Sequence, residues 1–170
     1  MRPELDATDL AEARRWLEAA RDDVVSDLLR EVFAEVASVV AERRPVCTAS
    51  GRCCQFEAYG HRLYVTGLEA AFTVDRLRRE LSREVCEADI ERAREAGGCC
   101  FQIDGLCSVH EIKPVACRTY YCDPTSAIWQ TELTESSLDR LKRLHELHAI
   151  PYRYGEWRSM LSLVLAAEER

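Results

Sequence analysis

The sequence predicts a mainly α-helical single domain with small β-hairpins, in which helices surround a cysteine-rich loop region. Apolar residues recur at helical spacing towards both ends of the chain. All of the nine cysteines except Cys86 fall into two polar, glycine-containing segments, residues 45–65 and 99–124. A chain of 170 residues can bury a hydrophobic core without disulfides, so the cysteines are not needed for stability.

The first element is one long helix, or two stacked helices, over residues 9–44. Asp9 together with Glu12 can cap its start, and Pro45 ends it. The apolar residues that give the helical spacing are Leu28, Leu29, Val32, Phe33, Val36, Val39 and Val40.

The middle of the chain, residues 45–124, is the cysteine cluster region. It opens with "CTASGRCC" and a predicted hairpin, "QFEA" and "RLYVT" around Tyr59-Gly60. Thr66 and Glu69 form a capping-box pair, and helical patterning then runs to Gly97-Gly98 with a break near Ser82. Cys86 lies in this helical stretch and reads as an inert core thiol.

The C-terminal part, residues 134–170, predicts two helices, 134–149 and 155–170, separated by Ile150-Pro151. His145 and His148 read as a surface pair beside an apolar stripe. No repeat or linker divides the chain, so we expect one domain over residues 1–170 that brings the two cysteine segments together.

Composition narrows the functional classes. The N-terminus lacks the apolar run of a signal peptide and no stretch approaches a membrane span, so we expect a cytoplasmic protein without a membrane partner. The net charge of −7 argues against nucleic acid as a partner. The arginine-rich run at 76–83 reads as a solvated helix face. In the cytoplasm, clustered cysteines indicate metal binding or catalysis more often than disulfides.

The second cysteine segment contains the strongest hairpin signal in the chain, Asp-Gly between two alternating runs in "CFQIDGLCSV". A two-residue loop pairs Ile103 with Leu106 and Gln102 with Cys107, and by extension Cys100 with Val109. Cys100 and Cys107 then emerge on one face, as two ligands of one metal ion require. Cys99 points to the other face, where it is either a thiol beside the metal ligands or a packing residue.

Six thiols form the candidate ligand set, which exceeds the four of a closed zinc site. The surplus leaves open a two-metal site, an iron–sulfur cluster with spare thiols, or one metal site plus a reactive thiol. Cysteines acting merely as small buried hydrophobes would not explain their confinement to polar loops. The six are Cys47, Cys53, Cys54, Cys100, Cys107 and Cys117, and the nearest residues to complete a shell are Cys122, His110, Gln102 and Glu111.

The pattern resembles that of the YkgJ-like cysteine cluster proteins, which carry a zinc- or iron-chelating domain with a CxxCxxCC motif. The resemblance covers residues 45–124 and includes "VHEIKP" and the Cys117-Arg118 pair. It implies that the same six cysteines chelate metal, and that Lys113-Pro114 and Arg118 are framework positions. Ser50 stands where the pattern has its second cysteine, and His110 stands where it commonly has an aromatic residue.

The sequence therefore predicts a protein that chelates zinc or iron, as a mononuclear site, a dinuclear site or an iron–sulfur cluster. The alternative is a metal- or iron–sulfur-dependent enzyme, with group transfer or redox chemistry as options, since a similar cluster occurs in flagellin lysine methylases. No Walker loop, GxGxxG or nucleophile elbow identifies a substrate. A thiol redox protein is a third reading, which Ser50 weakens because it removes the second cysteine of a CxxC pair.

Overall fold

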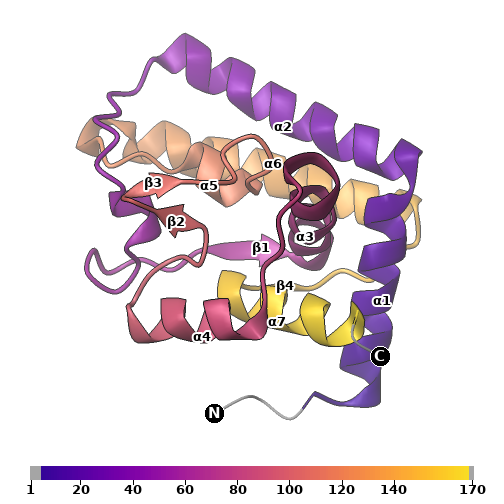
Figure 1. Ribbon diagram of the computed structural model, residues 1–170. Coiled ribbons are helices and arrows are strands. Elements are labelled where there is room, and N and C mark those ends of the chain that lie inside the picture. The colour runs from indigo at the N-terminus through magenta and orange to yellow at the C-terminus, as the bar shows by residue number, and fades with distance from the viewer. Residues whose placement is uncertain (1–4, 169–170) are drawn as a thin grey trace.

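The structure is a computed structural model that describes residues 5–168. Over this range the chain folds as one mainly helical domain with two small antiparallel sheets, which confirms the predicted fold class. Figure 1 shows the arrangement. The helices are α1 (Ala7–Arg21), α2 (Asp23–Arg43), α3 (Gly67–Leu81), α4 (Glu87–Glu95), α5 (Val115–Thr119), α6 (Ala127–Leu147) and α7 (Trp157–Glu168). The strands are β1 (Tyr64–Thr66), β2 (Gln102–Ile103), β3 (Leu106–Cys107) and β4 (Tyr154–Glu156), and Arg52–Cys54 and Pro124–Ser126 form the 3-10 turns η1 and η2.

The N-terminal helical segment is two helices that meet at Asp22. Asp22 ends α1 in an extended conformation, and its side chain accepts the backbone N–H of Val25 to cap α2. The cap predicted at Asp9 and Glu12 is wrong by one helical turn. Asp6 is the N-cap residue, and it forms a reciprocal capping box with Asp9.

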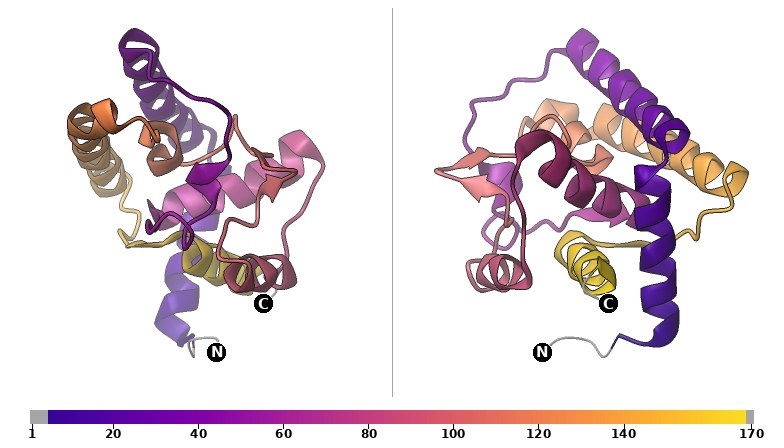
Figure 2. Two further views of the ribbon diagram at one scale, coloured as in Figure 1. Left: turned by 90° about the vertical axis from the view of Figure 1, so that its left-hand side faces the viewer. Right: turned by 45° about the vertical axis from the view of Figure 1, so that its right-hand side comes forward.

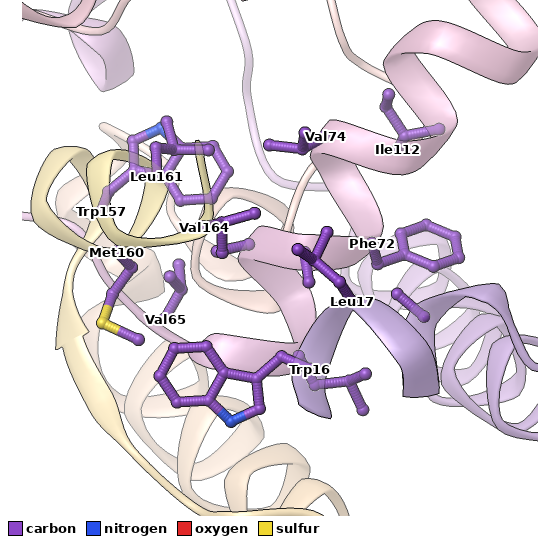
Figure 3. Close-up of a cluster of buried hydrophobic side chains, with 14 of the residues drawn as sticks. Trp16, Leu17, Val65, Phe72, Val74, Ile112, Trp157, Met160, Leu161 and Val164 are labelled. Carbon is purple, nitrogen blue, oxygen red and sulfur yellow. The ribbon is translucent and has the colours of Figure 1, made fainter. Parts of the chain in front are cut away.

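The hydrophobic core lies where α1, α3 and α7 pack around β1 (Figure 3). Trp16 of α1 and Trp157 of α7 are each at most 1% exposed, so both indoles are removed from water. Gly67 begins α3 against the Trp16 ring, where an added Cβ would lie 2.3 Å from ring carbons. A side chain at this position would push α1 and α3 apart, which explains the glycine.

The first predicted hairpin does not form. Residues 56–60 make successive turns, closed by the Gly60 N–H to the Glu57 carbonyl and the His61 N–H to the Phe56 carbonyl. β1 pairs instead with β4, close to the C-terminus, with Val65 opposite Gly155. Phe56 is buried at 1% exposure, and a turn inserts its ring into the core where a local strand would not.

Local signals elsewhere in the middle of the chain are confirmed. Thr66 and Glu69 form the predicted capping box at the start of α3. Ser82 adopts a left-handed conformation that ends α3, and Gly97 turns the chain after α4 with a φ of +70°. Pro114 precedes α5 and supplies its N-cap.

Two C-terminal expectations are corrected. α6 begins seven residues before the predicted start at Thr134, directly after the η2 turn. His145 is buried at 1% exposure, because its Nδ1 contacts the carbonyl of Pro151 at 3.0 Å while its ring packs edge-on to Tyr152. His148 is exposed, so the two histidines do not form a surface pair.

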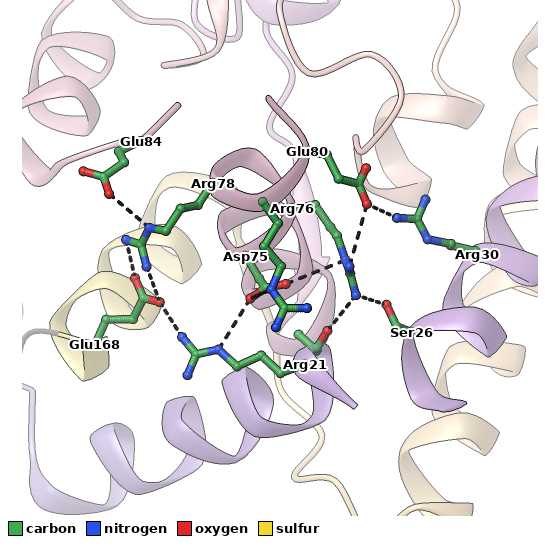
Figure 4. Close-up of polar contacts among 11 residues, drawn as sticks. Arg21, Ser26, Arg30, Asp75, Arg76, Arg78, Glu80, Glu84 and Glu168 are labelled. Carbon is green, nitrogen blue, oxygen red and sulfur yellow. Dashed lines mark hydrogen bonds and ion pairs between the residues drawn. The ribbon is translucent and has the colours of Figure 1, made fainter. Parts of the chain in front are cut away.

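Charged side chains tie α1, α2, α3 and α7 together (Figure 4). Asp75 is buried and lies 3.4 Å from the guanidinium groups of Arg21 and Arg79. Glu168 of α7 accepts from Arg21 and Arg78. The run at 76–83 was predicted to be a solvated helix face; the side chains of Arg78 and Arg79 are about half exposed, whereas that of Arg76 is only 12% exposed. Within residues 5–168, no helix combines the length and apolar character needed to cross a membrane.

Candidate metal centre

Three segments of the chain bring their cysteines to the same side of the domain. They are the loop between α2 and η1, the β2–β3 hairpin, and α5 with the residues that follow it (Figures 1 and 2). The hairpin forms with the predicted register, Gln102 opposite Cys107 and Ile103 opposite Leu106. Asp104 and Gly105 both have positive φ, as the turn at this position requires. The two cysteine segments therefore converge, as the sequence predicts.

Glycines permit this convergence because the two segments meet backbone to backbone. Gly51 has a φ of +70°, and a Cβ added there would lie 2.2 Å from the carbonyl oxygen of Gly105. A Cβ on Gly98 would lie 2.9 Å from the carbonyl oxygen of Cys54. The turn that carries Cys53 and Cys54 is thus pressed against the second segment on both sides, and neither contact leaves room for a larger residue.

Hydrogen bonds fix the same contact. The Cys99 N–H donates to the Cys54 carbonyl at 2.9 Å, and the Gln102 side-chain amide donates to the Gly51 carbonyl at 2.9 Å. Each bond joins the first cysteine segment to the second. Gln102 was predicted as a candidate to complete a metal shell, and its amide is instead used to hold the first loop.

The Arg158 side chain of α7 links the turn after the first cysteine pair to the residue before the second. Its guanidinium donates to the Glu57 carboxylate at 2.9 Å and to the Gly98 carbonyl at 3.3 Å, and it also pairs with Glu156 at 2.8 Å. The Arg158 residue is 5% exposed, so its bonds to the Gly98 carbonyl and the largely buried Glu156 meet little competition from water, whereas the Glu57 carboxylate is about half exposed. Nothing in the sequence pattern singled out Arg158, because its partners come from distant segments.

Glu69 attaches α5, and hence Cys117, to the start of α3. Its carboxylate accepts the Val115 N–H at 2.8 Å as well as the N–H and hydroxyl of Thr66. Burial raises the pKa of Glu69, although these three donors act in the opposite direction. Arg118 ties α5 to the residues just before it by donating to the carbonyls of Lys113 and Glu111. The framework role that the resemblance implies for Lys113-Pro114 and Arg118 stays a prediction.

Cys54 is the hub of the thiol group. It is buried, and its thiol is in hydrogen-bonding contact with the thiols of Cys107, Cys53 and Cys99. These contacts raise the pKa of Cys54. The pKa of Cys53 is lowered to about 6 and that of Cys107 to about 7, in each case chiefly through the interaction with the Cys54 thiol, whose single S–H can donate to only one sulfur at a time. Thiols from both segments therefore shift one another's pKa.

Strand alternation predicts that Cys100 faces the metal site and Cys99 faces away from it, and the structure shows the opposite order. Cys99 contacts Cys54, whereas the thiol contact of Cys100 is with Cys99. Contacts with Cys100 and Cys54 hold the pKa of Cys99 well below its ordinary value, and the Phe101 N–H acts in the same direction. The structure thus places Cys99 nearer the hub than Cys100. Which of the two is a ligand stays a prediction.

Cys117 lies beside this group within the fold. Burial raises the pKa of its thiol, and the nearby sulfurs of Cys99 and Cys107 act in the same sense. Lys113 opposes this, because its ammonium lies close enough to lower the pKa of Cys117 and also of Cys53 and Cys107. A cation beside several sulfurs favours their thiolate form, which is the form that binds metal.

A cavity of about 310 Å³ opens beside the thiols. The exposed residues Cys47 and Cys122 line it, together with Ser50 and His110. His110 lies 3.7 Å from Glu111, and the charge of Lys113 lowers its pKa. All the cysteines proposed as ligands therefore lie at this cavity or in the thiol group beside it, except Cys100, which reaches the group through Cys99.

In chemistry the donors fit a thiophilic metal ion, because thiolates are the preferred ligands of zinc and of iron–sulfur clusters. In arrangement, no group of three or more His, Cys, Asp or Glu side chains within residues 5–168 is positioned to hold a metal ion. The thiols contact one another instead. Two sulfur ligands on one tetrahedral zinc ion lie roughly 3.8 Å apart for Zn–S bonds of about 2.3 Å.

Cys86 is the one cysteine outside this region, and the prediction that it is a core thiol is wrong. It is exposed, it occupies the N-cap position of α4, and its thiol contacts the Asp89 carboxylate at 3.1 Å. The end of α3 at Leu81 moves this position out of the helical stretch and onto the surface.

Comparison of the chain with protein-family models, with curated proteins and with solved structures found no match. The resemblance to the YkgJ-like proteins therefore stays a prediction based on the cysteine spacing.

Proposed function

We propose that this protein binds zinc or iron through a split cysteine cluster, whose two halves come from residues 47–54 and 99–122. The observation that carries the proposal is the position of Cys54. Its backbone carbonyl accepts the Cys99 N–H at 2.9 Å, and its thiol interacts with Cys53 of its own segment and with Cys99 and Cys107 of the other. The fold thus brings cysteines from two distant segments together, with glycines where the two backbones meet.

The state of the cysteines supports the same proposal. All nine, each within the described part of the chain, are free thiols, so the close sulfurs are not explained by disulfides. Free thiols in this number fit the reducing cytoplasm, which we propose as the location. Binding would draw the contacting sulfurs onto a common ion and release their protons, and it would stabilise the contact between the two segments.

The experiment is elemental analysis of protein made with zinc and iron supplied and purified without oxygen. Cys54→Ser removes the hub thiol, and Cys86→Ser is the matched control because Cys86 is an exposed free thiol that does not line the cavity. We expect stoichiometric metal in the wild type and in the control, and loss of most of it from Cys54→Ser. Circular dichroism checks that the variants fold.

Two outcomes would overturn the proposal: a wild-type protein that takes up neither metal, or a Cys54→Ser protein that keeps its full metal content. The colour of the wild type then distinguishes the metals. A brown protein with visible absorption indicates an iron–sulfur cluster, and a colourless protein with stoichiometric zinc indicates a zinc site.

The cavity favours a second candidate, a metal- or iron–sulfur-dependent enzyme. A closed structural site has no need of open space beside its ligands, whereas a catalytic site keeps a position open for a substrate. The cavity of about 310 Å³ is at the lower end of the range for small-molecule sites. Lys113 and Tyr120 line it together with the thiols, and these residues do not identify a reaction.

A further inference from the structure

His145, in the last turn of α6, is a buried histidine outside the candidate metal centre. It is 1% exposed, and its Nδ1 lies 3.0 Å from the carbonyl oxygen of Pro151 and 3.3 Å from that of Ile150. Both partners accept hydrogen bonds and cannot donate them, so Nδ1 carries the proton of the neutral ring. The other ring nitrogen, Nε2, is then unprotonated.

Nε2 is buried and has no hydrogen-bond partner within residues 5–168. The neutral ring tolerates this position, because its bare nitrogen loses only a contact that it could have accepted. A proton on Nε2 would instead bury a positive charge and an N–H donor where no acceptor is present, which is far more costly. Burial accordingly lowers the pKa of His145, although the two carbonyl contacts act in the opposite direction.

No charged side chain in the described part of the chain offsets this cost. The influences on the His145 ring are burial and its two backbone contacts, without a contribution from a neighbouring charge. The titratable or charged side chains on the segments packed nearby are Glu31 of α2, Glu69 of α3, Asp139, Arg143 and His148 of α6, Tyr152 after it, and Asp9, Glu12, Arg15 and Arg153 where the connection meets α1.

The ring holds the connection between α6 and β4, residues 148–153, onto α1. The Pro151 carbonyl, which His145 contacts, also accepts a hydrogen bond from the Trp16 indole of α1 at 2.7 Å. The Ile150 N–H donates to the backbone carbonyl of His145 at 2.8 Å. Both the ring and the backbone of His145 therefore hold the same short segment, and one carbonyl joins that segment to two helices.

We propose that His145 is an acid-sensitive latch, which leaves the core when it takes up a proton and releases residues 148–153 from α1. Water supplies the proton to Nε2 and accepts the hydrogen bond of the new N–H in the open form. The proposal does not depend on the metal centre.

The sign of the pH dependence follows from the two states. The closed form binds the proton less readily than the open form does, so the latch has its full stability above the ordinary histidine pKa of about 6.5 and weakens as the pH falls below it. Because opening takes up one proton, the opening equilibrium should change by up to about tenfold per pH unit.

The test is amide hydrogen exchange of the wild-type protein by NMR between about pH 5 and pH 8, corrected for the intrinsic exchange rate. The Ile150 amide reports the latch, and amides in the middle of α3 report global unfolding. We expect Ile150 to be less protected than α3, since the opening is local. Its protection should fall by up to about tenfold per pH unit below about pH 6.5.

Two variants separate His145 from other titrating groups. His145→Asn keeps an amide donor at the position of Nδ1 but takes up no proton, and His148→Asn is the matched control because His148 is an exposed histidine one turn later. The pH dependence of Ile150 protection should be lost in His145→Asn and retained in His148→Asn. The ring signals of His145 in wild-type protein give a measurement that needs no variant, and their titration midpoint should lie below about 6.5.

Three results would each overturn the latch. The first is a His145 ring that titrates at or above its ordinary pKa. The second is an Ile150 amide as well protected as those of α3 at low pH, which would show that residues 148–153 open only when the whole domain unfolds. The third is a pH dependence of Ile150 protection that survives in His145→Asn.

Discussion

Replacing Gly51 by alanine tests whether the first cysteine loop is locked against the hairpin. Gly51 has a φ of +70°, and its added Cβ would lie 2.2 Å from the Gly105 carbonyl oxygen and 2.5 Å from the Gln102 amide nitrogen. Gly60 is the matched control. It has nearly the same φ, +66°, but an added Cβ there meets nothing within 4 Å.

Both substitutions have the same free-energy cost of backbone strain, but only Gly51→Ala also causes a steric clash. Each places a Cβ in the left-handed region, which costs about 1–2 kcal/mol, and each regains about 0.4–1 kcal/mol by restricting the unfolded chain. Gly51→Ala alone must move backbone by roughly 1 Å, and overpacking of this kind costs about 1–3 kcal/mol. We therefore expect Gly51→Ala to be less stable than Gly60→Ala by about 1–3 kcal/mol.

The assay is urea unfolding of both variants, monitored by tryptophan fluorescence and repeated on metal-loaded protein. For a chain of this length, each kcal/mol corresponds to about 2–4 °C in Tm, which gives an independent measurement. Because the displaced loop carries Cys53 and Cys54, Gly51→Ala should also lower metal content, and Gly60→Ala should not. Equal stabilities within about 0.5 kcal/mol would refute the locked contact.

Two further predictions concern single thiols. Because Cys99 contacts the hub and Cys100 contacts only Cys99, Cys99→Ser should lose more metal than Cys100→Ser by elemental analysis; the reverse order would restore the ligand choice made from strand alternation. In metal-free protein Cys53 has a pKa of about 6, so its alkylation by iodoacetamide, measured by peptide mass spectrometry, should rise through pH 6 as the thiolate forms. Cys54→Ala removes the donor chiefly responsible and should move the rise to higher pH; an unmoved midpoint would contradict the thiol contact.

Much of the fold was predictable because its signals are local. The Asp104-Gly105 turn fixes its own register, and the Thr66–Glu69 capping box needs only neighbouring residues. The pairing of β1 with β4 had no such signal. Each strand has three residues, too few for a periodic pattern, and the partner lies near the other end of the chain. The predicted hairpin failed for the same reason, since its alternation was too short to exclude a turn.

The candidate site was also predictable only in part. The sequence predicts that the two cysteine segments meet, because cysteine spacing and a hairpin are sequence features. It does not predict the side chains that hold the two segments together. Arg158 and Glu69 act through backbone groups of remote segments, and nothing near either residue in the sequence indicates a partner there. A buried charge takes its role from the fold around it, so its position in the sequence alone does not reveal it.

The order of Cys99 and Cys100 shows where a correct local rule stops. Alternation of side chains holds within a strand, but β2 begins only at Gln102. Before that point the chain is directed by the bond from the Cys99 N–H to the Cys54 carbonyl, which turns Cys99 towards the hub. Ser50 lies outside any strand as well, so alternation does not apply to it, and it lines the cavity together with Cys47.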